Sequence, residues 1–339
     1  MMRDRVWMLG AALAAVATVS ATPVLADPPK MIAYVSPDPL TGNPFLIMGR
    51  AGTDKIARKL GAQSKTYEAN NPGSRKADIE QAIQDGAEIV VLLSFEFADI
   101  LPDEAKAHPN TKFLIVDQCV KDPGPNVFCS VFREYEGSFL VGVEAALTSK
   151  SHKVGAMAAL DIPFLHRFTV AFGEGAKTAV PDIQFSPTLV IGGDKPFNDP
   201  DKGEQQALAM IGDGADRIYT AAAGSNFGVF KAASDKGVLA IGVDVNQCPG
   251  RPGSVLDNMQ KKIDVVVGQA VEGIVAGTQE HIVAYGMKEG GLTLTSLEPD
   301  LADSKCEIVK FPDAVAKMKE YMAKIESGEL KIADPLMAQ

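Results

Sequence analysis

Short apolar runs rich in Val, Ile and Leu alternate with longer amphipathic stretches through most of this 339-residue chain. The short runs predict buried strands, and the longer stretches with 3.6-residue spacing predict helices. Strands are expected at 31–35, 63–68, 88–93, 112–116, 153–158, 184–191, 217–220 and 239–243, and helices at 44–60, 74–85, 97–108, 135–148, 165–180, 200–213, 226–236, 263–276 and 312–327. Such alternation is typical of parallel sheets with helices on both faces. Because the series restarts after residues 150–152, we expect an α/β protein with two doubly wound parallel-sheet lobes.

The first 26 residues have the pattern of a cleavable export signal. Arg3 and Arg5 precede an apolar run at 6–19, and Val24 and Ala26 occupy the −3 and −1 positions of a signal peptidase site. The run is shorter than the ~20 residues that a membrane-spanning helix needs. We therefore expect residues 1–26 to be a signal peptide. No cysteine follows the cleavage site, so we expect a free protein without a lipid anchor, located in the periplasm of a two-membrane bacterium.

The net charge of the chain is −10, and loss of the signal removes two Arg and one Asp and makes it −11. Nucleic-acid-binding proteins need basic faces, so we expect no nucleic-acid partner. The 313 residues that remain after the signal fit two lobes of ordinary domain size.

The four cysteines, all after the signal, allow three disulfide pairings, and an oxidising compartment favours disulfides over free thiols. Cys119 and Cys129 flank a turn-forming stretch at 121–126 and could close a short loop, which leaves Cys248 to pair with Cys306. No C-x-x-C spacing with accompanying histidines is present, so the sequence predicts neither a zinc site nor another metal site.

Ligands of open parallel sheets bind beyond the carboxyl ends of the strands. The residues that follow the predicted strands are carboxylates, small residues and aromatics: Ser36, Asp38, Ser94, Phe95, Glu96, Asp117, Gln118, Asp161, 222–226 including Gly224 and Asn226, and Asp244. Ionised carboxylates such as Asp117 and Asp244 can each accept two hydroxyl hydrogen bonds, which suits a ribose diol. Aromatic rings can stack a planar ring, and the candidates are Phe45, Phe95, Phe168 and Phe197.

Signatures of catalysis are missing from the sequence. It contains no G-x-S-x-G nucleophile elbow, no G-x-x-x-x-G-K-[ST] phosphate loop and no glycine fingerprint after the first predicted strand. The four histidines are scattered, and no cysteine has a partner for nucleophilic catalysis. We therefore expect a binding protein without catalytic residues or cofactors rather than an enzyme.

Four motifs in this order carry a resemblance: EGSFLVG at 136–142, DIPF at 161–164 followed by Arg167 and Phe168, FNDP at 197–200 with Lys202 and Gly203, and IGVD at 241–244. Over nearly the whole mature chain, the sequence resembles the basic membrane protein (BMP) family, the substrate-binding proteins of ABC importers. Its better-understood members are similar to purine nucleoside receptors. The resemblance implies a type I periplasmic-binding-protein fold with the ligand cleft between two lobes joined by three crossovers.

The resemblance further implies that the chain returns to the first lobe at about residue 257. The lobes would then comprise 27–149 with about 257–287, and 150–256 with about 288–339. By position in the family pattern, Asp117, Asp244 and Lys261 would hold the ribose, and Phe45 is the aromatic that opens the first helix.

The first loop departs from the family pattern, because Ser36 stands where an aspartate is usual. Asp38 or Asn43 could substitute for it. Since this loop faces the base in the family, the identity of the base is the least determined part of the ligand.

We expect a monomeric receptor that closes on a purine nucleoside and delivers it to an ABC permease. The alternatives are the same fold binding a sugar or other small metabolite, or an exported hydrolase or nucleosidase that uses paired aspartates.

Overall fold

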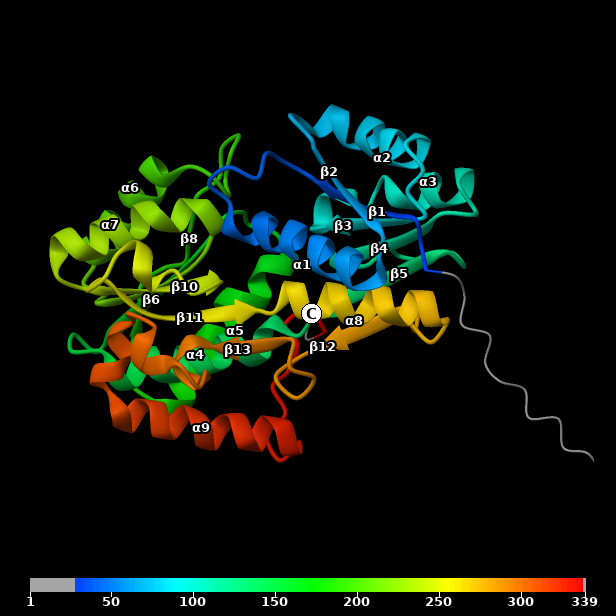
Figure 1. Ribbon diagram of the computed structural model, residues 1–339. Helices are drawn as coiled ribbons and strands as arrows, with labels where there is room; N and C mark the ends of the chain where they lie inside the picture. Colours follow the sequence, from blue (N-terminus) through cyan, green and yellow to red (C-terminus); the bar gives the residue numbers. More distant parts are fainter. Residues whose placement is uncertain (1–27, 338–339) are drawn as a thin grey trace, which may run out of the picture.

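The computed structural model describes residues 28–337, and the expected signal peptide lies outside the described residues. Strands alternate with helices along the chain (Figure 1). The strands are β1 (Met31–Ser36), β2 (Gln63–Glu68), β3 (Ile89–Leu93), β4 (Lys112–Asp117), β5 (Val127–Phe132), β6 (Lys153–Ala158), β7 (Gln184–Phe185), β8 (Leu189–Val190), β9 (Arg217–Ala221), β10 (Leu239–Asp244), β11 (Val255–Lys261), β12 (Ile282–Tyr285) and β13 (Leu292–Leu294). The helices are α1 (Pro44–Leu60), α2 (Arg75–Gln84), α3 (Leu101–Ala107), α4 (Glu134–Thr148), α5 (Pro163–Ala179), α6 (Pro200–Gly212), α7 (Asn226–Lys236), α8 (Ile263–Ala276) and α9 (Pro312–Ser327).

Two sheets divide the molecule into two lobes. The first sheet has the order β12-β5-β4-β3-β1-β2, and the second has the order β13-β11-β10-β9-β6-β7, with β8 also pairing β6. All neighbouring strands are parallel except β13, which is antiparallel to β11. We call the first sheet and the helices packed on it the first lobe, and the second sheet with its helices the second lobe. The predicted architecture of two doubly wound parallel-sheet lobes is confirmed.

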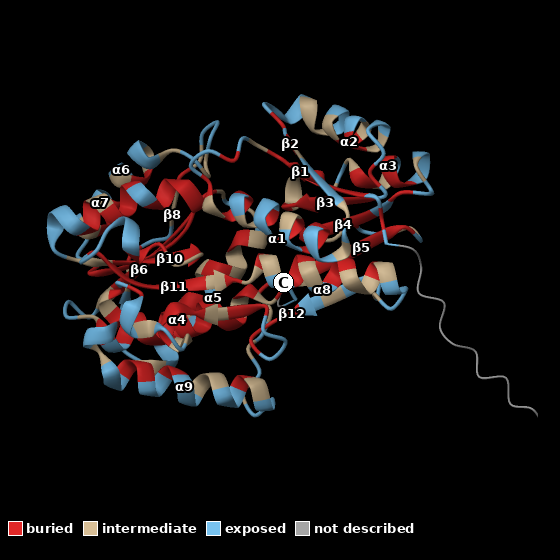
Figure 2. Cartoon of the chain, in the orientation of Figure 1, coloured by how far each residue is buried: buried red, intermediate tan, exposed pale blue. Residues whose placement is uncertain are grey.

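The central strands are buried on both faces. All residues of β1, β3 and β9 are buried, and Figure 2 shows the buried residues concentrated in the sheets while the outer faces of the helices are exposed. Their continuous apolar character is what a parallel sheet covered by helices requires. In each lobe the strand order reverses beside the first strand, between β1 and β3 and between β6 and β9. Such reversal points open a crevice at the carboxyl ends of the strands.

Some elements differ from the sequence prediction. The stretch 184–191 forms two short strands instead of one, because Pro187 lies between them and has no N–H to donate to a ladder. Helix α3 begins at Leu101 rather than near 97, with a proline in its first turn. Strands β5, β11, β12 and β13 were not predicted, since β11 carries polar residues, β13 has three residues and β12 is a partly exposed edge strand.

The crossovers between the sheets also differ from the expected positions. Helix α4 packs against α5, α9 and strands of the second sheet, so the chain leaves the first lobe after Phe132 rather than near residue 150. Strand β11 belongs to the second sheet along its whole length, so the return falls after Lys261 rather than at about 257. Helix α8 then packs on α1, and β12 pairs with β5 in the first sheet.

Both expected disulfides are present. Cys119–Cys129 joins the loop after β4 to β5, and Cys248–Cys306 joins the loop after β10 to the segment before α9. Each bond therefore fixes a loop that directly follows a strand ending in aspartate. Among residues 28–337, no helix combines the length and the apolar character needed to cross a membrane.

Candidate functional site

A cavity lies between the two lobes at the carboxyl ends of their strands. Its volume is about 540 Å³, a figure that includes space open to solvent. The lining residues are Pro37, Asp38, Asn43, Phe45, Leu46, Ser94, Phe95, Glu96, Asp117, Phe164, Leu165, Phe168, Phe197, Ala221, Ala223, Val243, Asp244 and Lys261.

Strained backbone gathers at this cavity. Within the described part of the chain, six residues other than glycine have a positive φ, and four of them line the cavity: Ser94 (99°), Asp117 (88°), Ala223 (47°) and Asp244 (71°). Left-handed backbone costs an L-residue about 1–2 kcal/mol. Ser94, Asp117 and Asp244 lie at or directly after the ends of β3, β4 and β10, so the strain turns their side chains at the places where the two sheets face each other.

Lys261 is the buried cation of the site. It ends β11 in the second sheet, is 2 % exposed, and forms an ion pair with Asp117 at the end of β4 in the first sheet. Its Nζ also lies 3.0 Å from Oε1 of Glu134, the first residue of α4, whose side chain is fully buried. Burial by itself lowers the pKa of Lys261, but the surrounding carboxylates outweigh it and raise this pKa. Lys261 therefore remains charged and holds the two lobes together from within.

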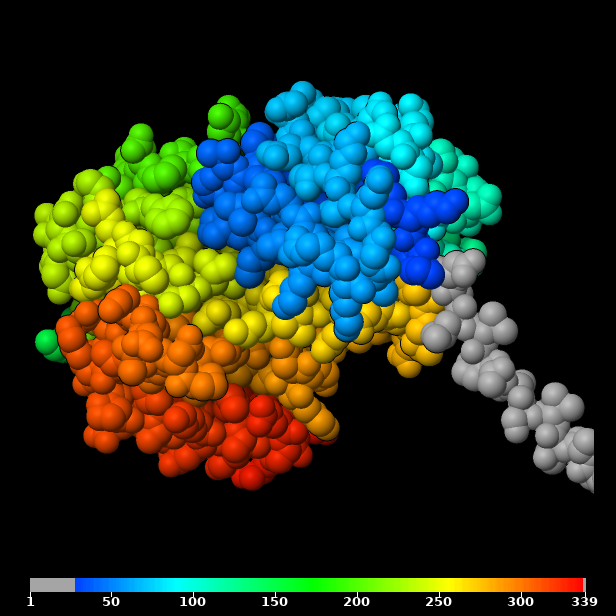
Figure 3. Space-filling view, viewed as in Figure 1, coloured from blue at the N-terminus to red at the C-terminus, as the bar shows by residue number. Residues whose placement is uncertain are grey.

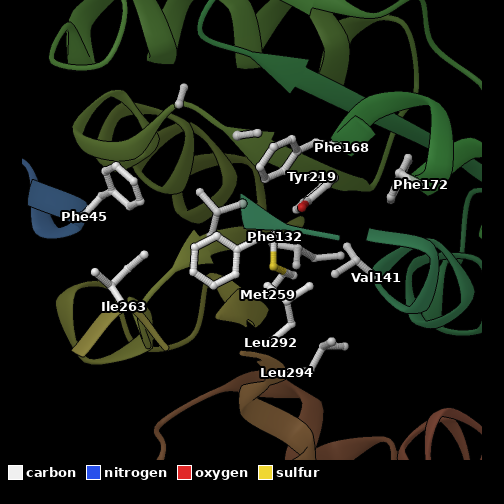
Figure 4. Packing of buried hydrophobic residues seen from close by; sticks show 14 of the residues in the cluster. Phe45, Phe132, Val141, Phe168, Phe172, Tyr219, Met259, Ile263, Leu292 and Leu294 are labelled. Atoms are coloured by element: carbon white, nitrogen blue, oxygen red, sulfur yellow. The ribbon is translucent and has the colours of Figure 1, made fainter. Parts of the chain in front are cut away.

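Four phenylalanine rings surround the Lys261 ammonium group. Its Nζ lies 5.5 Å from the ring centroid of Phe45, 5.2 Å from those of Phe132 and Phe168, and 5.3 Å from that of Phe164. Figure 4 shows the rings of Phe45 and Phe168 on two different sides of Phe132. These distances are within cation–π range. The cavity thus combines a fixed charge with apolar aromatic walls.

The carboxylate of Asp244 is free of protein partners in the described part of the chain. Asp244 is 7 % exposed and lines the cavity, and its side chain has no hydrogen bond or ion pair with residues 28–337. Burial raises its pKa to about 7, and the charge of Lys261 only partly opposes this shift. Burial likewise raises the pKa of Glu134 to about 7. A ligand with hydroxyl or N–H donors would supply the partners that Asp244 lacks.

The loop between β1 and α1 is held by its own contacts. The Ser36 hydroxyl donates to the backbone oxygen of Asp38 at 2.6 Å, so Ser36 stabilises the loop and does not line the cavity. Asp38 lines the cavity and lies 3.5 Å from Nη2 of Arg75, and burial raises its pKa. Asn43 caps α1, because its Oδ1 accepts hydrogen bonds from the backbone N–H groups of Phe45 and Leu46.

The structure brings most of the expected site residues together and separates three of them from the cavity. Those that line it are Asp38, Asn43, Phe45, Ser94, Phe95, Asp117, Phe168, Phe197, Asp244 and Lys261. Besides Ser36, Gly224 and Asn226 do not line it. The Asn226 Oδ1 accepts hydrogen bonds from the Thr220 hydroxyl and the Ala222 N–H, and its Nδ2 donates to Gln247, so Asn226 holds the start of α7 in place.

Gly224 lies instead at a contact between the lobes. A Cβ at this position would lie 2.4 Å from the backbone oxygen of Gly42 in the first lobe. Nearby, Nδ2 of Asn198 in the second lobe lies 3.4 Å from the backbone oxygen of Thr41. Figure 3 shows the blue atoms of the first lobe lying against the green and yellow atoms of the second. The lobes therefore meet at the rim of the cavity.

Phe164 and Glu134 are among the residues near the cavity that were not predicted as site residues. Phe164, in the first turn of α5, contacts both Phe95 and Phe168 with ring centroids 6.2 Å and 5.9 Å apart. Glu134 starts α4 directly after β5, a strand that the sequence pattern did not predict. A buried acidic residue that follows a strand end would have been the signal for it, had β5 been recognised.

Comparison with known proteins identifies the family. Residues 30–326 match the family model Bmp, described as "ABC transporter substrate-binding protein PnrA-like". The chain belongs to this family. It is a substrate-binding protein of ABC transporters, as its sequence indicated, and proteins of the Bmp family are binding proteins rather than enzymes.

Individual relatives of this Bmp protein agree with that assignment. It is 30% identical over 281 residues to the "ABC transporter nucleoside-binding protein BmpA" of Lactococcus lactis, covering 77% of this chain and 76% of the relative. It is 30% identical over 274 residues to the "CD4+ T-cell-stimulating antigen" of Listeria innocua, covering 76% and 74%. A solute-binding protein of an ABC transporter system from Aeropyrum pernix superposes with a TM-score of 0.78 at 26% identity, covering 91% of this chain and 94% of that structure.

Substrate-binding proteins of this kind face the outside of the cell membrane, bind small ligands and work with a permease.

Proposed function

We propose that the ligand of this Bmp protein is a purine nucleoside, bound in the cavity between the lobes. The observation that carries the proposal is Asp244, a buried carboxylate whose side chain has no partner among residues 28–337, in a cavity walled by phenylalanine rings. A nucleoside offers a matching pair of groups, a flat ring for the aromatic walls and a ribose diol for the carboxylate. The name of the Lactococcus lactis relative, a nucleoside-binding protein, supports the same ligand class.

In this proposal the ribose lies against the acidic end of the cavity. Asp244 accepts hydrogen bonds from the ribose hydroxyls, and Asp117 and Lys261, already paired with each other, contribute an acceptor and a donor. Charge-assisted hydrogen bonds of this kind are the strong ones in a site from which water is excluded. The base then packs between rings of the two lobes, with Phe45 on one side and Phe168 on the other.

The ligand would act on the equilibrium between open and closed lobes. Asp117 and Phe45 belong to the first lobe, whereas Asp244 and Phe168 belong to the second. A molecule that contacts all four residues binds the closed form only, so binding shifts the population toward it. In this mechanism the closed form is the one that an ABC permease in the membrane recognises.

Further parts of the proposal follow from the sequence. We propose that the protein is exported to the periplasm by its first 26 residues, acts there as a monomer without a lipid anchor, and releases its ligand chemically unchanged. Two relatives from Pyrococcus species are named lipoproteins, so the proposed form without a lipid anchor would differ from them.

The test is a thermal-shift screen of residues 27–339 after unfolding and refolding to remove carried-over ligand. The panel holds purine and pyrimidine nucleosides, free bases, pentoses and hexoses. A ligand present at about 100 times its Kd should stabilise the protein by about 2.7 kcal/mol. Stabilisation by purine nucleosides supports the proposal. Stabilisation only by sugars, or only by free bases, would show that the ligand belongs to that class and not to the nucleosides.

Two controls sharpen the screen. Asp244→Asn should lose the shift with every nucleoside while remaining folded. Chromatography of the nucleoside after overnight incubation separates binding from catalysis, because release of free base and ribose would show a nucleosidase instead of a receptor.

A further inference from the structure

The C-terminal segment after α9 returns to the middle of the molecule. In Figure 1 it is the red stretch that rises from the end of α9. Asp334 in this segment forms a two-pronged ion pair with Arg167 of α5, with its Oδ1 3.0 Å from Nε and its Oδ2 2.6 Å from Nη2. Oδ1 of Asp334 also accepts the backbone N–H of Leu336 at 3.0 Å, which fixes a turn, and Pro335 between them is buried. This fork geometry holds the guanidinium group in one orientation.

Arg167 connects the segment to the buried charges of the cavity. Its Nη1 lies 3.6 Å from Oε2 of Glu134, while Oε1 of Glu134 lies 3.0 Å from Nζ of Lys261. Neither oxygen of Glu134 has a geometrically good hydrogen bond within residues 28–337, so the two cations are its main stabilising partners. A series of alternating charges therefore runs from Asp334 through Arg167 and Glu134 to Lys261.

Leu336 lies where the two lobes meet. It lines a surface hollow with residues of the first lobe, Phe95, Ala98 and Gln118, and with residues of the second lobe, Ile162, Pro163 and Phe164. Phe95 and Phe164 also line the ligand cavity. The C-terminal segment is thus attached to the second lobe through Arg167 and lies over the seam behind two aromatic walls of the site.

We propose that residues 334–337 form a C-terminal strap that holds the ligand site in its binding geometry, with Asp334 and Arg167 as positioning residues. Asp334 orients Arg167, Arg167 supplies the second counter-charge of Glu134, and Glu134 keeps Lys261 beside the ligand. Leu336 covers the seam that opens when the lobes separate. In its effect on ligand binding, this inference rests on the proposed function.

The physical argument concerns the cost of a buried carboxylate. A buried charge that loses one of its partners is strongly destabilised, and the charge of Arg167 lowers the pKa of Glu134. A displaced Arg167 therefore raises this pKa further, so Glu134 takes up a proton and no longer holds Lys261 beside the ligand. Because Asp334 touches neither the ligand cavity nor Glu134, any effect of its removal on ligand affinity has to pass through Arg167 or through Leu336.

The experiment compares Asp334→Asn with a matched control in the same segment. Glu329→Gln removes an exposed carboxylate that, among residues 28–337, pairs with Lys324 alone, at 3.5 Å. Asp334→Glu keeps the charge and serves as the rescue variant, and Arg167→Met is made alone and together with Asp334→Asn. Guanosine and inosine are the probes, with Kd from calorimetry and dissociation rates from displacement of radiolabelled nucleoside.

We expect Asp334→Asn to weaken binding about tenfold, mainly through faster dissociation, with Asp334→Glu close to wild type and Glu329→Gln unchanged. Asp334→Asn keeps an Oδ1 acceptor for the Leu336 N–H, so it should act through Arg167 only, and the double variant should bind no more weakly than Arg167→Met alone. Wild-type affinity in Asp334→Asn, or fully additive effects of the two substitutions, would overturn the proposal.

A ligand-free measurement separates this inference from the proposed function. Hydrogen exchange of residues 133–137 and 259–263 should increase in Asp334→Asn and not in Glu329→Gln. If the wild-type protein binds no nucleoside, the proposed ligand is wrong, and the exchange data still decide whether the strap positions Glu134 and Lys261. Equal exchange in both variants would refute the strap.

Discussion

Replacing Asp244 by Asn should move ligand affinity and protein stability in opposite directions. Asp244 is buried in the cavity and has no partner within residues 28–337, and burial raises its pKa from 3.8 to about 7. A hydrogen bond to a charged group is worth about 1.5–3 kcal/mol, so losing the contacts of a ribose diol should cost about 2–4 kcal/mol. This corresponds to a Kd that is about 30 to 1000 times higher.

The ligand-free protein should gain stability from the same change. A carboxyl group whose pKa is raised on folding binds more protons in the folded state, so its contribution becomes unfavourable as the pH rises from about 4 to 7. A shift of about three units has a ceiling of roughly 4 kcal/mol above pH 7, and Asn still requires desolvation, so we expect a gain of about 1–3 kcal/mol.

The assay is thermal unfolding of the ligand-free wild type and Asp244→Asn at pH 8 and pH 5, with calorimetric titration of the nucleoside. The stability difference should shrink at pH 5, where the wild-type carboxyl group is already protonated. A difference that does not change with pH would refute burial of the charge as its cause, and an unchanged Kd would refute the role of Asp244 in binding.

Asp216→Asn is the matched control. Asp216 directly precedes β9, and its carboxylate accepts the backbone N–H groups of Lys150 at 2.6 Å and Ser151 at 3.0 Å. Burial alone would raise the pKa of Asp216, but these contacts and the Ser149 hydroxyl lower it. This substitution should therefore reduce stability and leave the Kd unchanged, which is the reverse of the result expected at Asp244.

Three further predictions concern the closure of the lobes, the pH dependence of ligand affinity and the Cys119–Cys129 disulfide. Gly224→Ala should raise the Kd at least tenfold, because its Cβ would lie 2.4 Å from the backbone oxygen of Gly42 in the closed form; the Cβ would also lie 3.0 Å from the Phe197 backbone oxygen of its own lobe, so the ligand-free melting temperature should fall to a smaller extent, and equal affinities would contradict the closure mechanism. Nucleoside affinity should fall from pH 8 to pH 5, and calorimetry in two buffers at pH 6 should detect proton release, because binding needs ionised Asp244; a pH-independent Kd would exclude this coupling. Replacing Cys119 and Cys129 by Ser should reduce the free energy of unfolding by about 2–3 kcal/mol in a denaturant titration, since the bond closes a short loop; equal midpoints would contradict this.

The sequence was sufficient to predict the residues that lie at strand ends. Asp117 and Asp244 follow strongly apolar runs, and parallel strands bring their carboxyl ends to one edge, so their meeting at the cavity follows from the pattern. Lys261 was assigned by resemblance alone, because β11 carries Asp, Asn, Gln and Lys and does not have the apolar pattern of a buried strand. Asn226 was predicted as a ligand-binding residue because it follows a strand. Its side chain instead forms hydrogen bonds with Thr220 and Gln247 and does not line the cavity.

Long-range pairing explains what the sequence could not predict. Arg167 and Asp334 are 167 residues apart, and no local pattern indicates that the end of the chain meets α5. Glu134 has the composition of an ordinary helix start, where acidic residues are common because they stabilise the helix dipole. Only the three-dimensional structure shows that this helix start lies beneath the cavity and faces Lys261 instead of solvent.

The position of Lys261 links ligand recognition to lobe movement. Lys261 is the last residue of β11, and the chain passes from the second lobe to the first directly after it, at the start of α8. Its ion pair with Asp117 therefore joins the two sheets beside a crossover, where we expect opening to move the chain least. Under the proposed mechanism, Asp244 and Phe168 approach the first lobe only when the lobes close, whereas we expect the Lys261–Asp117 pair to persist in both states. In this mechanism the Lys261–Asp117 ion pair forms a permanent floor of the cavity, and Asp244 and Phe168 form a wall that closes over the ligand. Only ligand contacts to that wall shift the equilibrium between open and closed lobes.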